Sequence, residues 1–508
     1  KTAPMSFVNV FWLGTKSGTT TNEKGEFSLS RLNKNSKLVV SFVGYTNDTI
    51  TINENQNNID IILTSGITLE DVVVKSGLEG AYISKLKPIK TEVISEHGLQ
   101  QLACCNLSES FENNATVDVG FTDAVSGAKQ IQMLGLAGVY SQIITENIPA
   151  IRGLASTYGL DYIPGSWMEA IQISKGTSSV INGYESTTGQ VNVEYKKPQR
   201  TDKLHLNFYA NTEQRLEGNL TAATKVGDKF QTMVMAHASV LDNSIDMNKD
   251  GFLDMPKGNR INLINRWVYD GKKEECIQFV INGLQETREG GQLNFYNNKN
   301  EQNQDYYGIG INTQRVQAFL KAGFPLHFRH NTSIGFQLSS TFHEQKSYFG
   351  NNNYYGKENS FYSNVIYQSY IGNANHLFST GASYMQDLYN ESFNDSAFRK
   401  KEYIPGAFAQ YNYKYHDKLD IILGFRADDN SRYGAFLTPR AHLRYELNHL
   451  TVIRASAGKG YRSPLLISEN LSFLASSRNF VIHPNLKAEE AVNYGGSIVR
   501  EFHWDKDR

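Results

Sequence analysis

Residues 246–254 carry acidic and amide side chains at the spacing of a calcium loop. Asp246, Asn248, Asp250 and Asp254 stand at positions 1, 3, 5 and 9 of that pattern, and Gly251 supplies the sharp turn. Oxygen atoms at these positions surround the ion in an EF-hand loop, which ends on a bidentate glutamate. Lys257 stands in the glutamate's place. The sequence therefore predicts either a structural calcium ion completed by an acid from elsewhere, or an Asx-rich external loop.

Other reactive residue types lack the spacing that catalysis or metal binding requires. Cys104 and Cys105 are adjacent, and thiolates suit copper or zinc. No His or Met brackets the pair, so we interpret it as structural, because small cysteines are commonly buried. No GxSxG, HExxH or GxxxxGK motif occurs. We therefore expect no enzymatic activity and no required cofactor, with structural calcium as the one candidate.

The elements that must position these residues are clearest in the second half of the chain. Apolar residues occupy every second position in 316–324, 419–427 and 437–447, and mostly charged or polar residues lie between them. Successive side chains of a strand face opposite sides of its sheet, so each segment has an apolar face and a polar face. A soluble β-sandwich would show the same alternation. Alternation alone therefore leaves the class of β-protein open.

The length and number of these segments favour a membrane barrel. From Thr201 onward we count about fourteen, and many reach the ~9–11 residues that a tilted strand needs to cross a bilayer. Soluble strands usually have about 5–6 residues. Tight connections such as 372–375 alternate with long ones at 242–259, 289–312, 349–360 and 463–486. No apolar run approaches the ~18 residues of a membrane helix, so we expect a mostly β protein with an antiparallel transmembrane β-barrel.

Three parts precede the barrel that we assign to residues 200–508. Residues 1–64 predict a small β-sandwich, and residues 91–199 predict a compact α+β domain with a capping box at Asn106 and Glu109. Residues 65–90 predict a linker with one β-prone segment, 70–75. That segment is either a connecting strand of its own domain or an edge strand for a partner's sheet. The balance of 50 basic and 51 acidic residues argues against a nucleic-acid partner.

Several motifs, in the right order, resemble those of the TonB-dependent outer-membrane transporters. In the α+β domain they correspond to the family's IxIRGL, DGVP, IERIEVxKGP and GGVINI segments. They are Ile131–Leu136, Glu146–Pro149, Ile171–Gly176 and Gly189–Val193, followed in the barrel by Gly424–Asp428, Thr438–Arg440, Arg454–Pro464 and Pro484–Glu489. Residues 19–29 and 39–45 resemble a carboxypeptidase regulatory-like domain. The whole chain thus resembles the Bacteroidetes type of this family.

The resemblance implies that residues 91–199 are a plug inside a barrel of about 22 strands, several of them beyond Arg508. It implies a Gram-negative outer membrane, with lipid around the barrel, and active import of a large scarce nutrient. A metal chelate such as a siderophore, haem or cobalamin is favoured, with a surface lipoprotein as a further partner. The energy would come from TonB through a TonB box, for which the candidate residues are Glu70, Asp71, Val72, Val73, Val74 and Lys75.

By analogy with the family, two apical plug loops, 121–128 and 152–162, would contact the ligand. Their charged and aromatic residues suit a bulky chelate, although loop residues solvated in the vestibule are an equal interpretation. The residues are Asp123, Arg152, Tyr158, Asp161 and Tyr162.

Inward-facing charges of the barrel are interpreted as anchors for the plug rather than as ligand contacts. They are Arg426, Asp428, Arg440, Arg444 and Glu446. The alternative function is a surface receptor, an adhesin or a signalling receptor, built on the same scaffold without net transport. A soluble β-rich hydrolase has little support, because the chain carries none of the catalytic motifs sought above.

Overall fold

The structure is a computed structural model of the 508-residue chain, which forms two compact units. It describes residues 4–5, 8–12, 18–22, 24–30, 37–42, 48–52, 58–63, 80–84, 88–102, 105–112, 114–297, 306–326, 331–416, 418–448, 450–476, 480–483 and 486–502. Among these residues, no helix is both long enough and apolar enough to span a membrane.

The N-terminal unit contains an antiparallel sheet in the order β2-β1-β3-β4. Its strands are β1 (Asn9–Trp12), β2 (Gly18–Thr20), β3 (Lys37–Ser41) and β4 (Asp48–Thr51). Segments 27–29 and 59–63, which the alternation predicts as strands, carry no strand pairing, although Phe27, Leu29 and Ile61 pack against the core. Alternation indicates which side chains face a core. These two segments do place apolar side chains against the core, but they do not join the hydrogen-bonded sheet.

The second unit holds the plug domain, built on a mixed sheet in the order β11-β10-β13-β12-β6-β5. Its strands are β5 (Ala81–Ile83), β6 (Thr91–Ser95), β10 (Ser141–Thr145), β11 (Ile148–Ile151), β12 (Met168–Lys175) and β13 (Gly189–Tyr195). Only β10 and β13 run parallel. Strand β5 lies in the predicted linker and extends this sheet through pairing with β6. The four strands predicted at 129–134, 141–145, 169–175 and 190–196 are present.

Short elements complete the plug. A small sheet contains β7 (Asp118–Phe121), β8 (Lys129–Met133) and β9 (Leu136–Ala137). The helices are α1 (Glu96–Leu102) and the 3₁₀ turns η1 (Glu109–Phe111), η2 (Gly138–Tyr140), η3 (Gly153–Ser156), η4 (Gly159–Tyr162), η5 (Gly165–Trp167) and η6 (Val180–Asn182). Half of the predicted capping box forms. Asn106 Oδ1 accepts the Glu109 amide at 3.2 Å, but the Glu109 carboxylate accepts from Asn106 Nδ2 at 3.2 Å and from the Cys105 amide at 2.8 Å rather than from the Asn106 amide.

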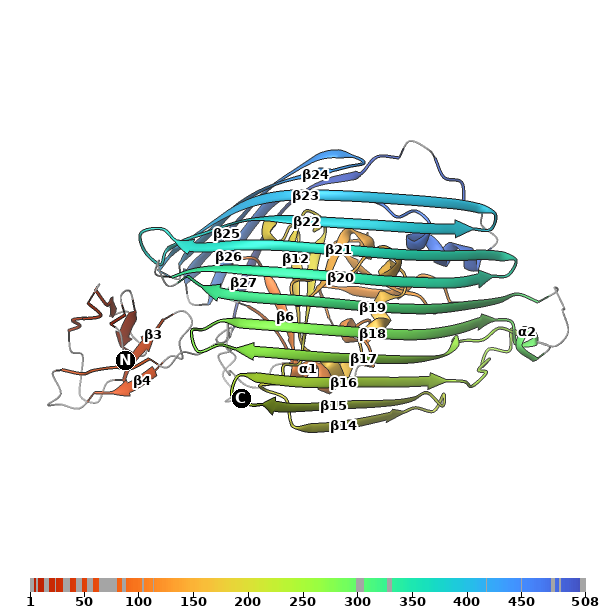
Figure 1. The fold of residues 1–508 in the computed structure, drawn as a ribbon, viewed down its shortest axis with the longest axis horizontal. Helices are drawn as coiled ribbons and strands as arrows, with labels where there is room; N and C mark the ends of the chain where they lie inside the picture. The colour runs from red at the N-terminus through yellow and green to blue at the C-terminus, as the bar shows by residue number, and fades with distance from the viewer. Residues whose placement is uncertain are drawn as a thin grey trace. The chain divides into compact units, whose positions relative to one another are not determined.

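The remaining strands form one antiparallel sheet of fourteen strands within the described residues, in sequence order from β14 to β27 (Figure 1). They are β14 (Leu204–Ala210), β15 (Leu216–Val226), β16 (Phe230–Leu241), β17 (Lys257–Asp270), β18 (Cys276–Gly291), β19 (Gly308–Pro325), β20 (Thr332–Phe349), β21 (Asn352–Tyr370), β22 (His376–Phe393), β23 (Ser396–Tyr415), β24 (Leu419–Asn430), β25 (Gly434–Asn448), β26 (Thr451–Arg462) and β27 (Glu489–Arg500). Helix α2 (Leu293–Asn297) and the 3₁₀ element η7 (Ser468–Ala475) lie in two of the connections.

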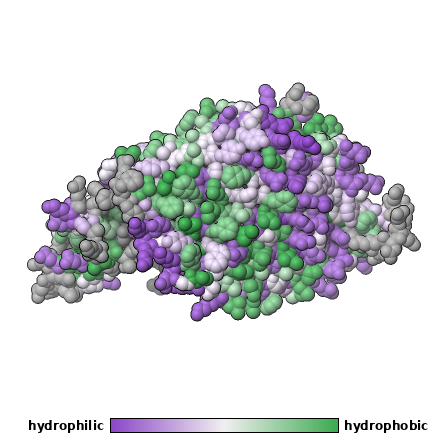
Figure 2. All heavy atoms as spheres, viewed as in Figure 1, coloured by the Kyte–Doolittle hydropathy of each residue, from purple (hydrophilic) through white to green (hydrophobic). Residues whose placement is uncertain are grey.

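The two faces of this sheet have the opposite polarity to those of a soluble barrel, because apolar side chains face outward and charged side chains face inward. Leu423 and Phe425 are each 52% exposed on its outer face, whereas Arg426 and Arg440 are 3% exposed on the inner face. Hydrophobic residues gather in a band over the strands, and hydrophilic residues lie toward the strand ends (Figure 2). An apolar outer band and a polar interior are the pattern of an outer-membrane barrel. The predicted fold class, a transmembrane barrel with an internal α+β plug, is confirmed.

One predicted loop is replaced by a pair of tall strands. Residues 349–360 were expected to be a long connection, but β20 and β21 continue to a two-residue turn at Gly350, where φ is +56° and Phe349 pairs with Asn352. The expectation was wrong because strands beyond the bilayer face water and carry the polar residues of a loop. The connections 242–256 and 463–488 are long, as predicted.

Candidate functional site

The inner face of the barrel binds the plug through buried charges. Arg440 Nη1 donates to the carbonyl oxygens of Ser178 and Ser179, and its Nη2 donates to that of Tyr184. Arg426 Nη1 donates to the Val180 carbonyl at 3.3 Å. Arg444 instead pairs with Asp420 and Glu446 of its own wall. Two of the three predicted anchoring arginines therefore contact the plug.

Glu146 makes the deepest of these contacts, which the sequence analysis did not anticipate. It lies in the turn between β10 and β11 and pairs with Arg266 of β17 at 2.9 Å and with Lys321 of β19 at 3.7 Å. Its Oε1 also accepts the amide of Tyr195 at 3.0 Å. Burial works to raise the pKa of Glu146, but the charges of Arg266 and Lys321 outweigh it and lower the pKa to about 2. Glu146 therefore stays ionised, and its ion pairs with Arg266 and Lys321 hold the plug to the barrel wall.

Three of the predicted ligand residues are buried against the barrel rather than open to a vestibule. Asp161 accepts from Arg288 Nη2 of β18 at 2.7 Å, and the Arg288 guanidinium lies 5.1 Å from the centre of the Tyr158 ring. The Tyr162 ring meets His343 of β20 edge to face at 5.9 Å. In this structure the three side chains are part of the plug–barrel interface. A direct contact with ligand stays a prediction for them.

The other two predicted residues differ in position. Asp123 is partly exposed at the β7–β8 loop, where its carboxyl accepts from the amide and the hydroxyl of Ser126. Arg152 lies at the plug apex and donates to Asp387 of β22 at 2.6 Å and to Glu185 at 2.9 Å. Arg152 therefore contacts both the plug and the barrel wall, and it lines a cavity.

The backbone after Arg152 approaches the wall so closely that it requires glycine. Gly153 has a φ of +62°, and a Cβ atom there would lie 2.7 Å from Glu358 Oε2 and 2.8 Å from the Tyr389 hydroxyl. The next amide, that of Leu154, donates to the same Glu358 oxygen at 2.9 Å. A left-handed backbone and a close approach are both tolerated by glycine alone. This turn fixes η3 against strands β21 and β22.

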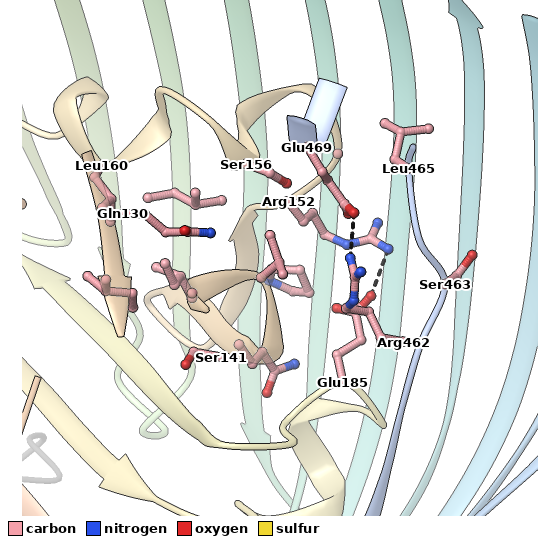
Figure 3. A pocket seen from close by; sticks show the side chains of 18 of the residues that line it. Gln130, Ser141, Arg152, Ser156, Leu160, Glu185, Arg462, Ser463, Leu465 and Glu469 are labelled. Carbon is pink, nitrogen blue, oxygen red and sulfur yellow. Dashed lines mark hydrogen bonds and ion pairs between the residues drawn. The ribbon is translucent and has the colours of Figure 1, made fainter. Parts of the chain in front are cut away.

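A cavity of about 70 Å³ lies between the plug apex, the wall and the connection after β26. The plug contributes Arg152 and Glu185, the wall Lys400 and Arg462, and the connection Glu469. Figure 3 shows the two guanidinium groups and the carboxyl groups of Glu185 and Glu469 at one end of the cavity. A volume of this size holds a few water molecules. A bulky chelate would need the covering connection to move.

The remaining predicted sites lie elsewhere. The candidate TonB box, residues 70–75, and Cys104 fall outside the described residues. Burial, followed by the nearby Glu109, raises the pKa of Cys105 to about 12, so its thiol is not poised to bind metal as a thiolate.

The predicted calcium loop is folded back on itself. Asp246 accepts the amides of Asp250 and Gly251 at 3.1 and 3.0 Å, and Asp254 accepts that of Met247 at 2.7 Å. Asn248 Oδ1 also accepts the Asp250 amide. Across the described part of the chain, no group of three or more His, Cys, Asp or Glu residues is arranged to hold a metal ion. Calcium binding stays a prediction from the sequence.

Comparisons with known proteins cover the chain in three segments. Residues 1–74 match a CarboxypepD_reg-like domain, residues 85–190 match the TonB-dependent receptor plug domain, and residues 242–508 match the TonB-dependent receptor-like β-barrel. A curated relative, the probable TonB-dependent siderophore receptor PirA of Acinetobacter baumannii, is 24% identical over 104 residues. That match covers 20% of this chain and 14% of the relative.

Solved structures share the fold at low identity. The siderophore receptor PirA from Acinetobacter baumannii is 15% identical with a TM-score of 0.58, over 74% of this chain and 61% of that chain. FpvA of P. aeruginosa, bound to pyoverdines, is 13% identical with a TM-score of 0.64, over 83% and 62%. The chain thus spans less than two thirds of the length of these structures.

The barrel match alone, residues 242–508, takes in more than half of the chain. It coincides with a sheet whose apolar residues face outward, around a domain that matches the plug. The chain belongs to the family of TonB-dependent receptors, which are outer-membrane β-barrel proteins.

Proposed function

We propose that the protein imports a ferric siderophore, or a metal chelate of similar size and charge, across the outer membrane. The cavity at the plug apex carries the proposal, because the cationic side chains of Arg152, Lys400 and Arg462 line it beneath the connection after β26. The carboxylates of Glu185, Glu402 and Glu469 line it as well. The relatives support it, since they include siderophore receptors and complexes with pyoverdine and enterobactin. Haem and cobalamin are the competing cargoes.

The buried ion pairs explain why such import needs an external source of work. Moving the plug breaks Glu146–Arg266, Asp161–Arg288 and Arg152–Asp387. Removing one partner of a buried pair costs ~3–5 kcal/mol, so separating three pairs costs on the order of 10 kcal/mol before water enters. A dissociation constant of about 1 μM corresponds to a standard binding free energy of about 8 kcal/mol, which does not leave a surplus. The plug therefore stays in place unless it is pulled.

We propose that TonB delivers this work through residues 70–75, which precede the plug and have the composition of an edge strand. Strand addition joins two proteins by main-chain hydrogen bonds and transmits tension along the chain. The test is uptake of radioactive iron, presented as ferric enterobactin, ferric pyoverdine or haem, by cells that express the protein. Deletion of Asp71–Val74 is expected to abolish uptake and to leave binding at the cell surface unchanged.

Two controls make the result decisive. Scrambling the order of residues 54–58, which lie further from the barrel along the sequence, leaves uptake intact under this proposal. If cells with the deletion still bind a chelate and take up as much iron as cells with the intact protein, the proposal of TonB-energised transport is contradicted. That result would favour a surface receptor. A strain without TonB gives the same comparison without any change to the protein.

A further inference from the structure

Residues 463–476, named the apical lid here, fold back into the mouth of the barrel. Thr157 Oγ1 at the plug apex donates to the Ser468 carbonyl at 2.5 Å, and the Tyr307 hydroxyl donates to the Leu474 carbonyl at 3.1 Å. The lid also buries four aliphatic side chains in the apical cluster, alongside aromatic rings of the plug and the wall. They are Leu465, Ile467, Leu471 and Leu474. The lid therefore covers the surface that a ligand would reach first.

A single carboxyl group of the lid lies at the charged end of the cavity, where Lys400 also pairs with Glu402 at 3.2 Å and Arg152 pairs with Glu185 at 2.9 Å. Glu469 Oε2 accepts from Arg462 Nη1 at 2.5 Å, and Glu469 lies close enough to Lys400 for the two charges to interact. Lys400 Nζ donates to Ser463 Oγ at 2.7 Å and to the Pro464 carbonyl at 2.8 Å, so it also holds the root of the lid. Figure 3 shows Glu469 and Arg462 joined at the end of the cavity where Arg152 and Glu185 also meet.

The cationic partner is built to keep its place when the lid leaves. Arg462 Nε and Nη2 donate to the two carboxylate oxygens of Glu489 on β27, at 3.0 and 2.9 Å. A bidentate contact of this kind fixes the plane of a guanidinium group. Only Nη1, which holds Glu469, would lose its partner. The departure of the lid therefore presents a fixed donor, beside Lys400, above newly exposed aromatic rings.

We propose that Glu469 is an internal stand-in for an anionic group of the ligand, and that such a group opens the apical lid by taking its place at Arg462 and Lys400. The inference rests on the proposed import function and adds to it the chemistry of the cargo. The ligand carries an oxyanion for the basic pair and an apolar or aromatic body for the surface vacated by Leu465, Ile467, Leu471 and Leu474. An uncharged chelate of the same size lacks the group that displaces the carboxylate.

Hydrogen exchange of the purified protein in detergent tests the lid directly. We expect citrate and ferric enterobactin to speed exchange in residues 463–476 of the wild type, and an uncharged ferric trihydroxamate to leave it unchanged. Citrate supplies the oxyanion without being a siderophore, so this readout does not depend on transport. Failure of uptake with a responsive lid would remove the import function alone. No response of the lid to either anion would overturn the present inference.

Three variants separate the role of Glu469, which holds the lid, from the role of Arg462, which would bind the anionic group of the ligand. Glu469→Gln removes the charge that holds the lid, so we expect about tenfold faster lid exchange, which corresponds to about 1.4 kcal/mol, and about tenfold tighter ferric enterobactin. Arg462→Gln loosens the lid to the same extent but is expected to show no gain in affinity, because the guanidinium group that would bind the ligand's anionic group is lost. Glu490→Gln, which changes a half-exposed carboxylate on β27 that pairs with Lys459, is the matched control and is expected to leave lid exchange near the wild-type rate.

Unchanged lid exchange in Glu469→Gln would overturn the proposal, as would an equal gain in affinity for Arg462→Gln. Heat-dependent migration on gels verifies that each variant has a folded barrel. A variant that fails this check is replaced by Glu469→Ala, which is expected to gain affinity, or by Arg462→Met, which is expected to show no gain.

Discussion

Replacement of Glu146 by glutamine is expected to loosen the plug more than any change on its surface. Glu146 and Arg266 are each 1% exposed, so solvent does not screen their interaction. The variant leaves Arg266 buried, with only the carbonyls of Tyr195 and Lys196 and the side chain of Gln278 as hydrogen-bond partners. Loss of one member of a buried pair costs ~3–5 kcal/mol. We expect the plug to lose stability by that amount.

The emission of Trp167 can report this loss, because its ring is fully buried in the plug beside Tyr195. Urea titration would be followed in a background where the three other tryptophans are phenylalanine. With a urea slope of about 1–3 kcal/mol per molar, a loss of ~3–5 kcal/mol should lower the midpoint by roughly 1–5 M. The same assay applies to Arg266→Met, which removes the opposite charge.

The double variant decides whether the pair itself is responsible. If an unpaired buried charge causes the loss, Glu146→Gln with Arg266→Met should be more stable than the sum of the single losses predicts, by about 1–3 kcal/mol. Strict additivity of the two losses would refute the reasoning, and so would a midpoint for Glu146→Gln within error of the wild type. Glu194→Gln, a partly exposed carboxylate on β13, is the matched control and should change little.

Three further outcomes are expected. The pKa of Glu146 in the folded plug is about 2, below its usual 4.5, so its contribution to plug stability is complete above about pH 4.5 and disappears as the pH falls through about 2. Over this pH range the urea midpoint of the wild type should therefore fall more steeply than that of Glu146→Gln. Gly153→Ala should destabilise the plug apex by about 1 kcal/mol or more, seen as faster hydrogen exchange in 153–162, since the added carbon meets Glu358 at a positive φ. If the 246–254 loop binds calcium, as its sequence predicts, tryptic cleavage after Lys249 should slow in calcium and recover with chelator; identical digestion in both, or an unchanged difference in Asp250→Asn, would contradict the site.

Much of the site could not be predicted because its residues lie far apart in the chain. The sequence selected Arg152 by its place in an apical loop, and the structure puts it at the cavity. Its partner Asp387, however, is 235 residues away, and no local pattern connects the two. Tyr158 and Tyr162 were selected as exposed aromatic residues, yet both are buried against the wall. An aromatic residue in a loop has the same sequence signature whether it faces solvent or a neighbouring domain.

The sequence by itself determined the barrel, because the alternation of 316–324, 419–427 and 437–447 sets which side chains share a face, and that period of two is a local property of a strand. It also determined the plug strands. Only the tertiary structure decided that Glu146 meets Arg266 and that Glu469 covers the cavity. These contacts depend on how the sheet curves around the plug, and that closure is set by the packing of the whole inner face rather than by any one segment.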